Sequence, residues 1–258
     1  KIKSKMRKIN LLAIFVLAVL VISLTTASML IPADDNAKEN AQAPENSPVI
    51  DKTAGGEWGL ERVDFIHYIK PENPAGGTTE KCYKLMGVKW KTLPVTYIIN
   101  PTNPSNLSES FIKSAIQASA ETWDSATSTE LFNDAYIINY TAQYGVQNFQ
   151  NALAFGDYPD NNVIAVTSVW YTRVGKQIVE FDQLYNTRFD WGDATLNPLV
   201  MDLQNIATHE LGHGVGLADI YSATCTAVTM YGYSTEGETS KKSLEQPDVT
   251  GLQKIYGI

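Results

Sequence analysis

The chain has 258 residues, of which 44% are hydrophobic, and its formal net charge is -8. That length accommodates one substantial domain with appendages, and the composition is typical of an ordered protein rather than a disordered chain. Five basic residues and no acidic residue precede position 28, so the remainder is strongly acidic. Nucleic acids and anionic membrane surfaces would repel it, and we expect neither as a partner.

The first 28 residues have the layout of a secretory signal. A basic cluster is followed by an apolar run from Leu11 to Leu24, which only Ser23 interrupts, and then by small residues. The run has 14 residues, whereas a helix that spans a membrane needs about 20. We therefore favour a cleaved signal peptide over residues 1–28 and a secreted protein. The alternative is an uncleaved anchor, which would place the protein at the cell surface.

Residues 29–79 predict a disordered spacer or pro-segment with a short ordered arm. Residues 32–56 contain few large apolar side chains and many Ala, Asn, Asp, Glu and Pro residues, which is typical of disorder. Residues 57–72 are apolar enough for one strand or packed arm, in which we expect His67 to be half-exposed and without function. Whether the segment inhibits, assists folding or only spaces the domain is left open.

From residue 80 to 258 the pattern predicts one domain with the element order β-α-β-β-β-α-loop-α. Asn106 or Ser108 can cap the first helix, which is long and has apolar residues at helical spacing, and Asp202 can cap the second. This order indicates an α+β fold with a twisted mixed sheet. The expected strands are residues 95–100, 136–140, 163–171 and 177–185, and the expected helices are residues 108–126, 201–214 and 247–256.

One short segment carries the chemistry that this chain displays most clearly. His209 and His213 are four positions apart, so on a helix both imidazoles lie on one face and can reach one ion. A catalytic zinc takes three protein ligands and a water, and Glu210 is placed to take a proton from that water. Gly216 can end the helix, after which Asp219 is the natural third ligand. The alternative is that Asp219 only hydrogen-bonds to a ligand histidine and water completes the metal.

The motif His209-Glu-x-x-His213-x-x-Gly216-x-x-Asp219 resembles the extended zinc signature of the metzincin metallopeptidases. Thr229-Met230-Tyr231-Gly232 is similar to their Met-turn, which implies that Met230 forms a hydrophobic floor beneath the zinc; the alternative is ordinary core packing. The resemblance is to a matrixin-like domain, and it implies a zincin fold with a long first helix, the zinc-binding helix and a C-terminal helix. It extends to residues 90–100, 118–123 and 248–257.

The chain departs from the matrixin pattern at three points. Asp219 stands where matrixins use a third histidine, which is similar to the snapalysin variant, and a carboxylate should weaken the pull of the zinc on its water. Matrixins also hold a structural zinc on further histidines, but only His67 remains outside the motif, so we expect no such site. Gly232 stands where astacins have a tyrosine ligand, and we assign no role to Tyr233.

The two cysteines, Cys82 and Cys225, predict a disulfide in an exported protein. The alternative is an inhibitory thiolate on the zinc, as in the propeptides of some metallopeptidases. The sequence around Cys82 lacks the Arg-Cys-Gly core of that switch, and we favour the disulfide.

Two surface features each allow a second interpretation. A cluster of oxygen-bearing side chains could bind Ca2+, but such residues also dominate ordinary turns, which we favour. Asn106 and Asn139 begin glycosylation sequons, although each can instead serve as a cap or strand residue. The cluster consists of Asp157, Asp160, Asn161 and Asn162.

Together these features predict a secreted, monomeric zinc endopeptidase that acts on protein or peptide substrates. His209, His213 and Asp219 would hold Zn2+, with Glu210 as general base. The resemblance implies that substrate lies extended along an edge strand within residues 163–171. Two alternatives are a cell-surface zinc-containing binding protein without turnover and, if the amino-terminal helix is uncleaved, a membrane-tethered processing protease.

Overall fold

The structure, a computed structural model, describes residues 49–51, 59–72, 74 and 81–258. They all belong to one unit, Gln42–Ile258. The expected signal peptide and most of the expected spacer lie outside the described residues. No helix within the described part is long and apolar enough to cross a membrane.

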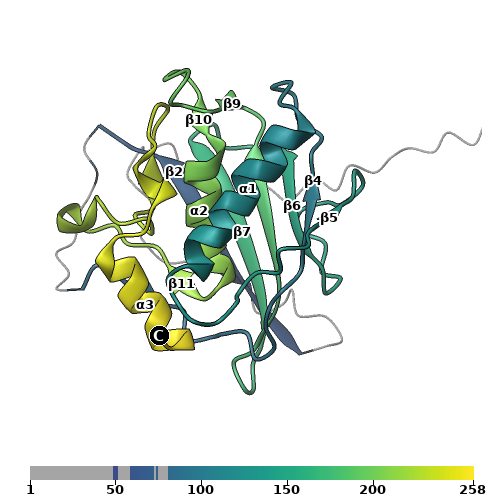
Figure 1. Cartoon of the computed structure of the whole chain (residues 1–258), viewed down its shortest axis with the longest axis vertical. Coiled ribbons are helices and arrows are strands. Elements are labelled where there is room, and N and C mark those ends of the chain that lie inside the picture. Colours follow the sequence, from purple (N-terminus) through teal and green to yellow (C-terminus); the bar gives the residue numbers. More distant parts are fainter. Residues whose placement is uncertain (1–48, 52–58, 73, 75–80) are drawn as a thin grey trace, which may run out of the picture. The chain divides into compact units, whose positions relative to one another are not determined.

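The described residues form α-helices packed on a large sheet, with smaller strand pairs beside them (Figure 1). The helices are α1 (Glu109–Asp124), α2 (Leu203–Gly214) and α3 (Gln246–Tyr256). The large sheet contains β1 (Val49–Asp51), β2 (Leu60–Ile69), β4 (Tyr97–Asn100), β5 (Ile137–Ile138), β6 (Asn151–Gly156), β7 (Val163–Thr172), β8 (Ile178–Asn186) and β12 (Tyr233–Ser234). The smaller pairs join β3 (Lys84–Leu85) to β11 (Leu217–Ala218) and β9 (Trp191–Gly192) to β10 (Met201–Asp202). Two short 3-10 helices are η2 (Ala223–Cys225) and η3 (Ser240–Lys242).

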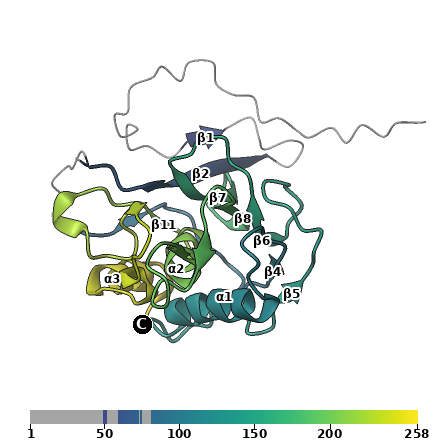
Figure 2. The ribbon, with the colours of Figure 1, turned by 90° about the horizontal axis from the view of Figure 1, so that it is seen from above.

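The strands of the large sheet lie in the order β1-β2-β7-β8-β6-β4-β5, with β12 paired to β2. β6 runs parallel to β4 and β8, whereas β7 is antiparallel to β2 and β8. Figure 2 shows α1 and α2 on the same side of this sheet. The mixed sheet and the three helices confirm the expected α+β class, with a long first helix, the helix of the histidine motif and a closing helix.

The first two helices begin at capping residues that the sequence supplies. Ser108 Oγ accepts a hydrogen bond from the Phe111 amide (3.2 Å), and Asp202 Oδ1 accepts one from the Asn205 amide (2.9 Å). Each cap satisfies an amide that has no partner within its helix. The end of α1 is tied to α2, because Trp123 Nε1 donates to the Thr208 carbonyl at 2.7 Å.

Two strands change the expected sheet. β6 was not among the expected strands, yet it lies between β4 and β8. β2, from the apolar stretch at residues 57–72, pairs with β7 from Leu60 opposite Thr172 to Tyr68 opposite Val163. The expectation that β7 is an edge strand is therefore wrong for this structure, because β2 fills its free side.

Candidate active site

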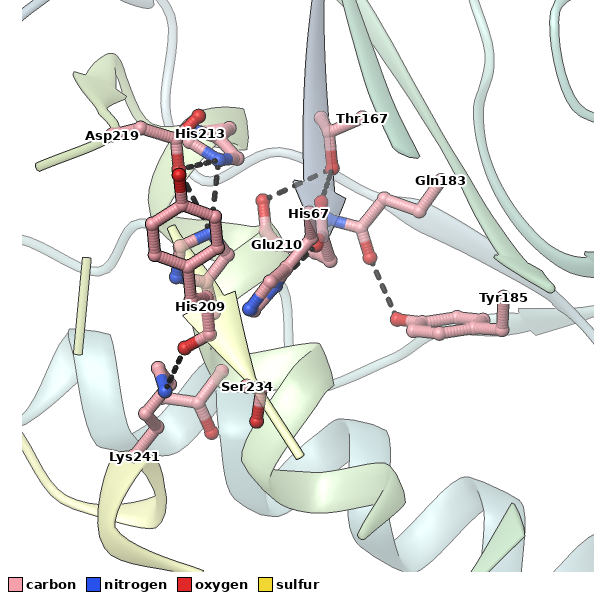
Figure 3. A network of polar contacts seen from close by, with 12 residues as sticks. His67, Thr167, Gln183, Tyr185, His209, Glu210, His213, Asp219, Ser234 and Lys241 are labelled. Carbon is pink, nitrogen blue, oxygen red and sulfur yellow. Dashed lines mark hydrogen bonds and ion pairs between the residues drawn. The ribbon is translucent and has the colours of Figure 1, made fainter. Parts of the chain in front are cut away.

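Three buried side chains on one face of α2 and one from the following loop converge. His209, Glu210 and His213 are completely buried, and Asp219 is 9% exposed. The Nε2 atoms of His209 and His213 are 3.2 Å apart. Asp219 Oδ1 lies 3.2 Å from the first of these nitrogens and 3.4 Å from the second. The three atoms therefore form a nearly equilateral triangle (Figure 3).

The hydrogen bonds behind the two histidines fix which nitrogen carries the proton. His209 Nδ1 lies 2.7 Å from the Thr229 carbonyl oxygen, and His213 Nδ1 lies 2.9 Å from that of Leu217. A carbonyl only accepts, so each Nδ1 is the donor and each neutral ring directs the Nε2 lone pair into the triangle. Asp219 Oδ1 has no hydrogen-bond donor among the described residues.

These atoms fit a zinc ion. Three electron-pair donors that face one another without an intervening proton repel unless a cation lies between them. Tetrahedral zinc with ligands at its usual distances separates its ligand atoms by about 3.3 Å, and the observed separations are 3.2 to 3.4 Å. Neutral imidazoles and a carboxylate are also the ligand types that zinc prefers.

Gly216 allows the chain to turn after α2, so that Asp219 lies against the two histidines. α2 ends at Gly214, and Gly216 follows with φ +99°, a conformation that side chains rarely adopt. A Cβ at Gly216 would also lie 2.6 Å from the Val88 carbonyl oxygen. The chain then pairs as β11 with β3, which delivers Asp219 to the two histidines.

The turn beneath the site is packed directly against α2. Met230 is 1% exposed, and a Cβ at Gly212 would lie 2.3 Å from its Sδ atom. Asp248 on α3 accepts hydrogen bonds from the amides of Thr229 (2.9 Å) and Met230 (3.2 Å). Because the Thr229 carbonyl also accepts from His209, α3 helps to hold the orientation of that ring.

Both carboxylate oxygens of Glu210 have partners outside α2. Thr167 Oγ1 on β7 donates to Oε2 at 2.5 Å, and His67 Nδ1 on β2 lies 3.1 Å from Oε1. Burial raises the pKa of Glu210 to about 7, although the neighbouring His213 opposes the shift. Sequence reasoning identified Glu210 but neither of these two partners.

The structure corrects the expectation for His67. It is 1% exposed rather than half-exposed, and its ring centroid lies 3.9 Å from that of His209. Phe65, two positions earlier on the same side of β2, stacks on His213 at 4.1 Å. Burial and the neighbouring His209 lower the pKa of His67 well below its ordinary value. Strand alternation could have placed Val63, Phe65 and His67 on one face, but not against α2.

The remaining expected features contribute no side chain to the triangle of His209, His213 and Asp219. The expected disulfide between Cys82 and Cys225 is present. In the oxygen-rich cluster, Arg188 Nε donates to Asp157 at 2.8 Å and another guanidinium nitrogen contacts Asn161. Calcium at that cluster stays a prediction, as does glycosylation.

The sequence model of the family described as Matrixin matches residues 89–257. This chain belongs to the matrixin family, whose members are zinc metallopeptidases. It is 27% identical to human neutrophil collagenase over 172 residues, 66% of this chain and 34% of that protein. It is also 25% identical to human matrix metalloproteinase-16 over 185 residues, 69% of this chain and 29% of that protein.

A plant relative matches a shorter stretch. The chain is 41% identical to metalloendoproteinase 1 of Glycine max over 69 residues, 26% of this chain and 21% of that protein. The chain thus spans about a third or less of the length of the curated relatives it matches. The family match begins at residue 89, so β2 and His67 lie outside it.

Proposed function

We propose that this matrixin is a secreted zinc endopeptidase in which His209, His213 and Asp219 hold the metal. The observation that carries the proposal is the triangle of His209 Nε2, His213 Nε2 and Asp219 Oδ1, with the buried Glu210 beside it. When bound, zinc polarises the scissile carbonyl and lowers the pKa of a bound water.

Glu210 acts as general acid and base in this proposal. Because Glu210 directly follows His209 in the chain, its carboxylate lies next to the proposed metal ligands. There it accepts a proton from the attacking water. Thr167 donates to Oε2 and so fixes the orientation of the carboxylate. Oε1 is then the atom that holds the proton and delivers it to the leaving amine.

We also propose a division of the chain into a signal peptide (1–28), a spacer or pro-segment (29–79) and the catalytic domain (80–258). The basic and apolar layout before residue 28 supports export. The Cys82–Cys225 disulfide supports an oxidising compartment. The substrate is a protein or peptide chain.

Replacement of Glu210 tests the catalytic assignment. Glu210→Gln keeps the size of the side chain but cannot accept the proton, so casein hydrolysis should fall about 10²- to 10⁴-fold. Zinc content, measured by atomic absorption, should stay at that of the wild type. The matched control is Glu130→Gln, because Glu130 is exposed.

The assay uses the chain after the segment before residue 80 has been cut away. Undiminished hydrolysis in Glu210→Gln would contradict the role of that carboxylate. A zinc-loaded wild-type chain that then cleaves no protein substrate would contradict the endopeptidase proposal itself.

A further inference from the structure

β2 closes the candidate site in this structure. Two of its side chains cover the two histidines of α2, since Phe65 stacks on His213 and His67 lies against His209. Both histidines are completely buried, and so is Glu210 between them. A peptide bond cannot reach the zinc triangle while β2 is in place.

β2 also takes the main-chain positions that an extended peptide would use. It pairs with β7 along its length, and it also pairs with β1 at Arg62–Asp64 and with β12 at Tyr68 and Ile69. On the β12 side, the Lys70 amide donates to the Ser234 carbonyl at 2.7 Å and the Tyr68 amide donates to that of Gly232 at 3.4 Å. Main-chain bonds of this kind accept almost any sequence in strand conformation. Of the three strands that pair with β2 in the described part of the chain, β7 and β12 lie within the family match, residues 89–257, whereas β1 and β2 itself lie outside it.

His67 adds a contact that an ordinary packing residue would not make. Its Nδ1 lies 3.1 Å from Glu210 Oε1, while Thr167 donates to Oε2, so both carboxylate oxygens have a protein partner and His67 lies where the proton-transferring Oε1 would meet a water (Figure 3). His67 Nε2 is buried without a hydrogen-bond partner among the described residues, which costs stability. An apolar side chain would fill this position without that cost, so the contact with Glu210 accounts for the histidine.

We propose that β2 is an internal pseudosubstrate strand, in which the main chain of Leu60–Ile69 pairs along β7, its end at Tyr68 and Ile69 also pairs with β12, and His67 blocks Glu210. The inference rests on the proposed endopeptidase function. Activity then requires β2 to leave, and a cut between β2 and Cys82 permits this. Both cysteines of the Cys82–Cys225 disulfide lie on the carboxyl-terminal side of such a cut, so the disulfide does not hold β2 to the rest of the protein.

The first test cuts the folded protein. A recognition sequence for a specific protease is inserted after Glu72, which is exposed, and the zinc-loaded full chain is cut and separated from its amino-terminal fragment. Casein hydrolysis should rise at least about tenfold, because activity scales with the fraction of molecules whose site is open. Binding of acetohydroxamate, a small zinc ligand, should appear only after the cut and needs no turnover.

A synthetic peptide with the sequence of residues 59–70 should inhibit the cut protein again. The same peptide with His67→Ala should inhibit several-fold less strongly, whereas one with Ile66→Ala should match the parent peptide. Ile66 is the matched control because it is half-buried and its side chain lies on the opposite face of β2. Equal inhibition by all three peptides would overturn the assignment of His67.

A second variant leaves the chain intact, in case the cut protein unfolds. His67→Ala in the full chain should raise casein hydrolysis and acetohydroxamate binding several-fold, and Ile66→Ala should not. If the uncut wild type hydrolyses casein and binds acetohydroxamate as well as the cut protein, the pseudosubstrate proposal is wrong and the endopeptidase stands. If the cut protein binds both acetohydroxamate and the peptide but cleaves nothing, the closure stands and the endopeptidase proposal fails.

Discussion

The helix α2, which carries two of the proposed zinc ligands and is called the ligand helix below, and the strand β2 meet at the same site but are held in different ways. α2 is fixed by side chains on several sides: Asp202 caps its first turn, Trp123 bonds to its backbone and Met230 packs against Gly212. β2 is held by main-chain pairing along its two sides and by Phe65 and His67 at the site. The hydrogen bonds that orient His209 and His213 come from Thr229 and Leu217 and not from β2, so the geometry of these proposed metal ligands should survive its departure.

The largest expected effect separates the two regions by metal affinity. Asp219→Ala should lower zinc affinity more than about 100-fold, because even a residue that only supports a ligand contributes 10- to 100-fold. His67→Ala should leave the affinity unchanged, since His67 belongs to the covering strand. Competition with a fluorescent chelator measures both variants. A loss of only about 10- to 100-fold in Asp219→Ala would mean that Asp219 supports a ligand instead of binding the metal. An equal loss in His67→Ala would show that β2 also contributes to metal binding.

A smaller effect tests how tightly the ligand helix is packed. At Gly212 a Cβ would lie 2.3 Å from Met230 Sδ and 2.7 Å from Trp123 Cζ2. Gly212→Ala should lower the free energy of unfolding by about 1–2 kcal/mol, because overpacking outweighs the better helix propensity of alanine. Thermal unfolding should show a Tm lower by about 2–8 °C.

The control for that packing test is Gly251→Ala on α3. A Cβ there would lie 3.0 Å from Leu217 Cδ2 and 3.2 Å from Tyr83 Cβ, which is less close than the contacts at Gly212, so we expect a smaller decrease in Tm. A Gly212→Ala protein as stable as the wild type would show that α2 is not confined as described.

The smallest expected effect concerns Thr167 on β7, the strand next to both regions. Thr167→Val in the cut protein should lower kcat about tenfold, as the loss of one hydrogen bond to a charged group does, with KM unchanged. Thr167→Ser should restore kcat, because it keeps the hydroxyl. Steady-state kinetics on a fluorogenic peptide separate the two constants. A change in KM alone would assign Thr167 to peptide pairing rather than to the orientation of Glu210.

The ligand helix was predictable because its signals are local. The four-residue spacing of His209 and His213, the cap at Asp202 and the glycine at position 216 all act within a few turns of chain. The zinc triangle follows from those signals together with Asp219. The sequence could not supply the carbonyl partners of the two rings, because one of them, Thr229, comes from a distant turn.

The strand β6, the pairing of β2 and the burial of His67 could not be predicted, because each depends on contacts with residues that are distant in the sequence. β6 is rich in alanine and glycine, which have low strand propensity, and it becomes a strand because β4 and β8 pair with both of its sides. β2 was expected only as a strand or arm, because its partner β7 lies about a hundred residues away in the chain. The burial of His67 follows from that pairing and from no local pattern.

The position of the disulfide determines whether β2 rebinds to its cleft as part of the same molecule or as a separate molecule. The chain has two cysteines, and they join the segment just before β3 to η2, so no disulfide holds β2. While the chain is intact, β2 meets its cleft at the high effective concentration of a tethered segment. After a cut on the amino-terminal side of Cys82 it becomes a separate molecule whose rebinding weakens with dilution. One hydrolysed bond would thus turn a concentration-independent equilibrium into a bimolecular one, and release into a large volume would be irreversible in practice.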